Sequence, residues 1–163
     1  MCIVSLLKET GETLSVAESL TGGKIADAVV SLPGASEVFF GGIVSYTDDV
    51  KHRLLGVKRE TLESHTAVSA EVAAEMAAGV AARFGTTLAV SATGVAGPGG
   101  GTEETPVGCV YLGLYHKGDV STVRLSLSGS REKIRLESAA LALKLVEKEL
   151  EKPAHLLDKH KSI

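Results

Sequence analysis

The sequence contains no tryptophan, and aromatic residues and cysteines are scarce. Only 4% of its 163 residues are aromatic, although 44% are hydrophobic. The core must therefore consist mainly of alanine, valine, leucine and isoleucine, a composition common in α/β proteins with covered sheets. The two cysteines, Cys2 and Cys109, are far apart and lack CxxC spacing. This argues against a disulfide framework and against a cysteine-rich zinc site.

Long hydrophobic runs and a strong charge of one sign are also missing. No apolar run approaches the ~18–20 residues of a membrane span, and the N-terminus lacks the pattern of a signal sequence. A net charge of −3 argues against broad binding to nucleic acid or anionic membranes. We therefore expect a cytoplasmic protein that binds neither nucleic acid nor membranes. Its length suggests one domain over residues 1–150, followed by a tail over 151–163.

Apolar patterns and Gly/Pro punctuation predict helices that alternate with strands, followed by a hairpin. This order predicts an α/β fold, a three-layer α/β/α sandwich with a mixed, mostly parallel sheet. The loops at the carboxyl ends of the strands should carry the site, at 18–23, 45–51 and 93–108. We expect helices near 3–10, 24–31, 48–55, 70–84 and 130–150, and strands near 13–19, 39–47, 86–94, 107–118 and 120–129.

The stretch "SVAESLTGGK" joins a buried-strand pattern to a helical one and contains Ser19. Ser19 is either a nucleophile or a cap of the following helix. No histidine lies at a convincing strand end and no G-x-S-x-G elbow is present, so a Ser-His-Asp hydrolase is disfavoured. Glu18 is either the buried partner of a cation or an exposed loop charge.

Lysine can replace histidine as the base when burial lowers its pKa. In "SYTDDVKHRLLG", Lys51 lies in the first turn of a predicted helix after a strand end. A helix N-terminus disfavours a positive charge there. Tyr46, five residues earlier, could relay a proton or orient the lysine. The alternative is a solvated lysine on a helical surface.

A glycine-rich loop, "SATGVAGPGGGTEETPVG", follows an apolar strand. It is neither a Walker A loop nor a G-x-G-x-x-G motif that opens a helix. Its backbone N–H groups can cradle an anion or polarise a carbonyl, although a plain flexible loop is the alternative. The binding residues that we expect in it are Thr93, Gly94, Gly97, Gly99 and Gly100.

Two arginines, Arg131 and Arg135, lie at i and i+4 near the start of the last helix. Such a pair can hold a phosphate or carboxylate bidentately, or can form a solvated face with nearby glutamates. The sequence shows no metal-ligand constellation, and we expect neither a metal nor a cofactor.

Four motifs together resemble the CinA C-terminal domain family, which includes standalone nicotinamide mononucleotide deamidases. They are "AESLTGG", "GGIVSYTDDVKHRLLGV", "ATGVAGPGGGTEETPVGCV" and "GSREKIR", in matching order. The resemblance implies an α/β/α amidohydrolase that uses a Ser-Lys mechanism without metal. The resemblance implies that this enzyme would convert nicotinamide mononucleotide to nicotinate mononucleotide and ammonia in pyridine nucleotide salvage.

Carried onto this chain, the resemblance places the nucleophile at Ser19 and the base at Lys51, assisted by Tyr46. The family's arginine falls on Arg135, with Arg131 as the alternative, and Arg135 would bind the ribose-phosphate together with the glycine-rich loop. Thr21 and Gly22 would join the substrate-binding residues. Leu20 stands where many members carry cysteine, and Thr47-Asp48 stands where Ser-Asn is common.

Two other functions remain open from the sequence. The domain could be a regulatory module linked to competence or DNA damage, or it could bind a nucleotide without turnover. Ammonia release distinguishes the enzyme from both. We also expect a homo-oligomer, a dimer or larger.

Overall fold

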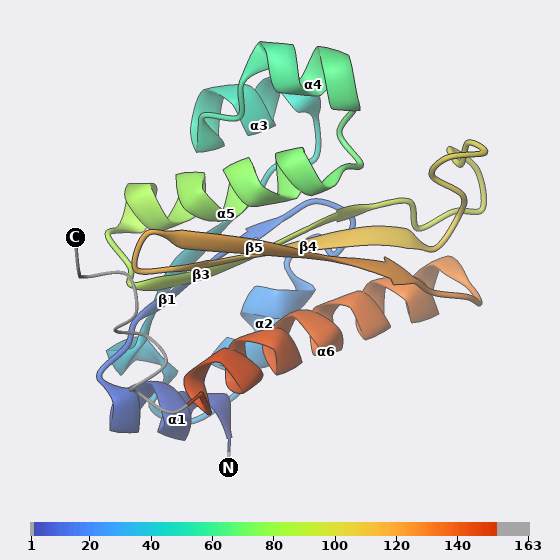
Figure 1. The fold of residues 1–163 in the computed structure, drawn as a ribbon. Coiled ribbons are helices and arrows are strands. Elements are labelled where there is room, and N and C mark those ends of the chain that lie inside the picture. The colour runs from blue at the N-terminus through green and yellow to red at the C-terminus, as the bar shows by residue number, and fades with distance from the viewer. Residues whose placement is uncertain (1, 153–163) are drawn as a thin grey trace.

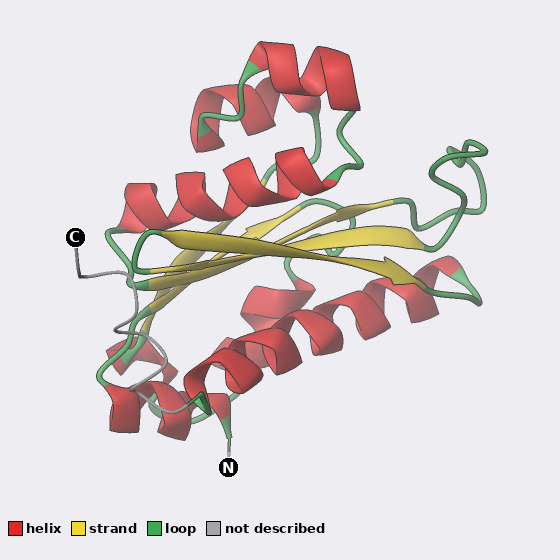
Figure 2. Cartoon of the chain, viewed as in Figure 1, coloured by secondary structure: helices red, strands yellow, loops and turns green. Residues whose placement is uncertain are grey.

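The chain folds into three layers around one five-stranded sheet, as a computed structural model of residues 2–152 shows (Figures 1 and 2). The helices α1, α2 and α6 cover one face of the sheet, and α5 covers the other, with α3 and α4 packed outside it. The predicted α/β/α sandwich is confirmed. The elements are α1 (Ile3–Thr10), β1 (Leu14–Glu18), α2 (Lys24–Val30), η1 (Ala35–Glu37), β2 (Phe39–Val44), α3 (Asp48–Leu55), α4 (Arg59–His65), α5 (Ala70–Phe84), β3 (Leu88–Gly94), β4 (Cys109–His116), β5 (Asp119–Ser126) and α6 (Arg131–Leu150).

The sheet is mixed, with the strand order β2-β1-β3-β4-β5. The strand β1 pairs in parallel with both β2 and β3, whereas β4 is antiparallel to β3 and to β5. Only β4 runs against the others, so the sheet is mostly parallel, as predicted. The central β1 is buried along its whole length, and its carboxyl end delivers Ser19 to the same edge as the ends of β2 and β3.

Capping residues set the boundaries of the helices that carry or support this edge. The hydroxyls of Thr47, Ser69 and Ser130 accept from backbone N–H groups at the starts of α3, α5 and α6. The helices α3 and α5 end at Gly56 and Gly85, both in the left-handed conformation that glycine adopts without strain. The sequence did not reveal the short helices η1 and α4.

The helix α5 packs closely on α3 because one of its residues has no side chain. A Cβ at Gly79 would lie 1.8 Å from the carbonyl oxygen of Leu55. The buried side of α5, with Val72, Met76 and Val80, faces the sheet. Ala73, Ala77 and Ala81 of α5 are buried within the chain as well, and the contact at Gly79 places α3 against α5.

The tail expected over 151–163 cannot be compared with the structure from residue 153 onward, because the structure describes residues 2–152. Among the described helices, none has the length and apolarity needed to cross a membrane.

Candidate active site

Ser19 lies directly after β1, in a tight turn over residues 19–23 that we call the nucleophile turn. Its backbone N–H donates to the carbonyl of Ala92 on β3 (2.9 Å), and its own carbonyl accepts from Gly22 (3.1 Å). Both backbone groups of Ser19 are thus fixed, which leaves only its hydroxyl free to be directed. Gly22 and Gly23 have φ angles of 58° and 102°, so the turn needs glycine at both positions.

Lys51 reaches the hydroxyl of Ser19 from the first turn of α3. Its Nζ lies 3.2 Å from Ser19 Oγ and donates to the carbonyl of Ser45 (2.9 Å). The side chain is 2% exposed. No carboxylate of residues 2–152 forms an ion pair with it. The surface-lysine alternative is therefore wrong.

Burial lowers the pKa of Lys51 from its usual value of 10.5, while the charge of Asp48 opposes this shift. A neutral amine can donate to the carbonyl of Ser45 and accept the Ser19 proton with its lone pair. A protonated amine has no lone pair to offer. The geometry and the lowered pKa together give Ser19 a candidate general base.

An open pocket of about 310 Å³ lies over the Ser19–Lys51 pair. Its wall comes from the nucleophile turn, the segment between β2 and α3, the loop before α5, the glycine-rich loop and the start of α6. Nine of the twelve residues predicted for the site line this pocket: Ser19, Tyr46, Lys51, Thr93, Gly94, Gly97, Gly99, Gly100 and Arg131.

Tyr46 and Arg131 meet at the mouth of the pocket. Arg131 Nη2 donates to the Tyr46 hydroxyl (2.9 Å), and Arg131 Nη1 donates to the carbonyl of Gly97 (2.8 Å). The structure shows no contact between the Tyr46 hydroxyl and Lys51, and Tyr46 is 59% exposed. Arg131 has no ion pair with any carboxylate of the described residues, so its charge is available to an anion in the pocket.

Three of the predicted residues, Thr21, Gly22 and Arg135, do not line the pocket. Thr21 and Gly22 belong to the nucleophile turn, and Arg135 contacts that turn. Arg135 Nε donates to the carbonyl of Leu20 (2.7 Å) and its Nη2 to that of Thr21 (3.3 Å). A Cβ at Gly22 would meet Arg135 Nη2 at 2.9 Å. The side chain of Thr21 is fully buried, and its hydroxyl has no hydrogen-bond partner among residues 2–152. Arg135 thus contacts the nucleophile turn, whereas Arg131 contacts the pocket.

Sequence reasoning missed the position of Glu18. This side chain is 1% exposed and accepts from the N–H groups of Gly23, Ile25 and Ala26 at 2.9–3.1 Å. It is neither the partner of a cation nor an exposed loop charge. The only available signal was a glutamate next to Gly-Gly and a helix start, where a carboxylate is favourable.

Backbone donors for an oxyanion are available beside Ser19, though not from Ser19 itself. The N–H of Ser19 is taken by Ala92, whereas those of Leu20 and Thr21 have no acceptor within residues 2–152. No group of three His, Cys, Asp or Glu side chains in that range could hold a metal ion. The arrangement is suited to acyl transfer through serine.

Comparisons with known proteins agree with this arrangement. The family model of the CinA C-terminal domain matches residues 1–150. A CinA-like protein of Kosmotoga olearia is 50% identical over 148 residues, which is 91% of this chain and 36% of that protein. The chain spans about a third of the length of the curated relatives it matches.

Solved structures give the same result. The competence/damage inducible protein CihA from Agrobacterium tumefaciens is 39% identical, with a TM-score of 0.88 and 92% of both chains covered. A competence-damaged protein (CinA) superfamily protein from Escherichia coli is 32% identical, with a TM-score of 0.85, covering 90% of this chain and 88% of its own. The chain therefore belongs to the CinA C-terminal domain family.

Proposed function

We propose that the protein is an amidohydrolase that deamidates nicotinamide mononucleotide through Ser19 and Lys51. The observation that carries the proposal is the 3.2 Å approach of a buried lysine amine, with a lowered pKa, to the hydroxyl of a serine fixed at a strand end. The substrate identity comes from the resemblance to the family. The pocket supports it with an arginine in its lining and a volume of about 310 Å³, which lies at the lower end of the range for small-molecule sites.

In the first half-reaction, neutral Lys51 accepts the proton of Ser19 as Oγ attacks the carboxamide carbon. The oxyanion that forms is stabilised by backbone N–H groups at Leu20 or Thr21; one such donor lowers the barrier by about 3–4 kcal/mol. The C–N bond then breaks, and Lys51 passes the proton to the leaving nitrogen, which departs as ammonia.

In the second half-reaction, Lys51 accepts a proton from water, and the hydroxide attacks the acyl-enzyme. The C–O bond to Ser19 breaks and the proton on Lys51 returns to Oγ. The carboxylic acid that forms gives its proton to solvent, and nicotinate mononucleotide leaves as the carboxylate. Arg131 binds the phosphate at the mouth of the pocket. In the structure its guanidinium donates to the Tyr46 hydroxyl and to the carbonyl of Gly97.

The first experiment measures ammonia and nicotinate mononucleotide from the purified chain, with a chelator present. Ser19→Ala and Lys51→Met should each reduce kcat by at least about a thousandfold, whereas Lys8→Met, which changes a surface lysine, should leave kcat unchanged. Turnover that survives both substitutions would overturn the mechanism. Absence of turnover in the folded parent would favour a binding or regulatory module.

The two arginines should differ in their kinetic effects. Arg131→Gln should raise KM for nicotinamide mononucleotide by about ten- to a hundredfold with little change in kcat, because it removes a contact to the phosphate. Arg135→Gln should lower kcat instead, since Arg135 contacts the nucleophile turn. A raised KM for Arg135→Gln together with a lowered kcat for Arg131→Gln would indicate that Arg135, not Arg131, binds the phosphate.

A further inference from the structure

The nucleophile turn is contacted by charged side chains on both its carbonyls and its N–H groups. Arg135 donates to the carbonyls of Leu20 and Thr21. Glu18 accepts from Gly23 at the end of the turn and from Ile25 and Ala26 in the first turn of α2. Each charged group therefore meets backbone dipoles of the opposite sign.

All the hydrogen bonds of the Glu18 carboxylate in the described residues come from backbone N–H groups. It is buried, none of the described ion pairs includes it, and the two N–H donors to its Oε2 and the one to its Oε1 are all backbone groups. Because the first N–H groups of a helix have no partner within the helix, these donors would lose their acceptor without Glu18. The side chain thus ties the end of β1 directly to the start of α2.

The turn between those two points has little stiffness of its own. Gly22 and Gly23 carry no side chains, and both adopt positive φ angles. Ser19 is fixed at the entrance by its bond to Ala92, and Arg135 holds the carbonyls of Leu20 and Thr21 in the middle of the turn. Glu18 is the side chain that holds the exit.

We infer that Glu18 is a positioning residue, whose carboxylate fixes the exit of the nucleophile turn and thereby aligns Ser19 with Lys51. It touches neither the pocket nor the substrate, since the residues that line the pocket do not include it. The kinetic part of this inference rests on the proposed function. Misplacing a reacting atom by 1 Å can cost about a hundredfold in rate.

The test compares Glu18→Gln with a matched control, Glu75→Gln. Glu75 also accepts hydrogen bonds at a helix start, from the Lys58 N–H (2.7 Å) and the Thr61 hydroxyl (2.8 Å), and does not line the pocket. Glu18→Gln keeps the size of the side chain but removes its charge and one acceptor oxygen. We expect kcat to fall by about ten- to a hundredfold with KM within about twofold. Glu75→Gln should keep the parent kcat.

A second measurement follows the reactivity of Ser19 without the nucleotide, as its labelling rate by a fluorophosphonate probe. Glu18→Gln should slow labelling by a similar factor, and Glu75→Gln should not. If Glu18→Gln does not fold, Glu18→Asp carries the same comparison, because it keeps the charge but withdraws it by one methylene.

The outcomes separate this inference from the proposed function. A parent that is labelled at Ser19 but releases no ammonia contradicts the proposed substrate, while the labelling rates still decide the role of Glu18. Parent-like kcat and labelling in a folded Glu18→Gln overturn the inference. Absence of both labelling and turnover in the parent contradicts both proposals.

Discussion

Lys51 is a buried amine whose surroundings favour its neutral form. Its Nζ contacts a hydroxyl and a carbonyl, and the nearest opposing influence on its pKa is Asp48. An amine must be neutral to accept a proton, so kcat should rise with pH as Lys51 loses its proton. The residue that tunes this limb of the pH profile is Asp48.

Asp48→Asn should move the acid limb of the kcat profile to lower pH. Removing the carboxylate takes away the charge that raises the pKa of Lys51, so burial lowers this pKa further. On the acid limb kcat should then increase by about two- to fivefold, the size of a modest charge interaction. Asp49→Asn is the control, because Asp49 pairs with Arg53 and Arg59 on the surface. A shift of the limb to higher pH would contradict this account.

Lys51→Met should produce an inactive protein that is more stable than the parent at low pH. Because the pKa of Lys51 is lowered in the folded state, the unfolded chain binds more protons between that pKa and 10.5. The free energy of unfolding of the parent therefore rises with pH across this window. Urea unfolding should show a gain of about 1 kcal/mol for Lys51→Met at pH 6, and less at pH 10. A gain independent of pH would assign the effect to packing.

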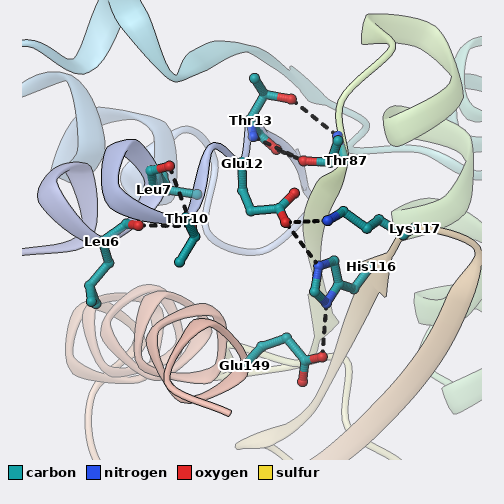
Figure 3. Close-up of polar contacts among 9 residues, drawn as sticks. All are labelled: Leu6, Leu7, Thr10, Glu12, Thr13, Thr87, His116, Lys117 and Glu149. Atoms are coloured by element: carbon teal, nitrogen blue, oxygen red, sulfur yellow. Dashed lines mark hydrogen bonds and ion pairs between the residues drawn. The ribbon is translucent and has the colours of Figure 1, made fainter. Parts of the chain in front are cut away.

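At the scale of elements, a second polar cluster joins three segments at the other end of the sheet (Figure 3). His116, the last residue of β4, contacts Glu149 of α6 through Nδ1 (3.0 Å) and lies 3.6 Å from Glu12 through Nε2. Glu12, before β1, also pairs with Lys117. This cluster connects the end of α6 to the start of the central strand, away from Ser19.

Glu12→Gln should weaken the fold without changing kcat. Burial acts to raise the pKa of Glu12, but hydrogen bonds from Lys117 and Thr87 and the nearby positive charges outweigh it, so this pKa lies below 4.5. Its contribution to stability is thus present above pH 4.5 and lost as the pH falls through the folded-state pKa. At pH 7 the free energy of unfolding should drop by about 1–3 kcal/mol.

Urea titrations at several pH values measure this contribution. The difference between the parent and Glu12→Gln should shrink as the pH falls below 4.5. Glu9→Gln, on the exposed side of α1, is the control and should change neither stability nor its pH dependence. A constant difference at all pH values would refute the assigned charge role.

At the scale of the whole molecule, the sequence predicted those helices and strands that have an apolar period and end at capping, glycine or proline residues. Helix α5 was readable because Ser69 and Gly85 bound an apolar stripe that packs on the sheet. Helix α4 was not, because it buries no residue and therefore has no apolar period. Because sites in α/β proteins lie at the carboxyl ends of parallel strands, the sequence predicted Ser19 and Lys51 at one edge of the sheet. The burial of Lys51 could not be predicted, because it depends on packing between segments far apart in the chain. The contacts of Glu18 and Arg135 also required the folded turn.

The described site comes from one chain, so the chain should be active alone. Ser19, Lys51, Gly97 and Arg131 reach the pocket from four segments of this chain. Specific activity should therefore stay constant from ~10 nM to ~10 μM protein, across which weak association would change. Sedimentation over the same range tests the expected homo-oligomer, and constant specific activity would mean that such an oligomer supplies no catalytic group. Specific activity that rises together with the sedimenting mass would show instead that a second copy completes the pocket.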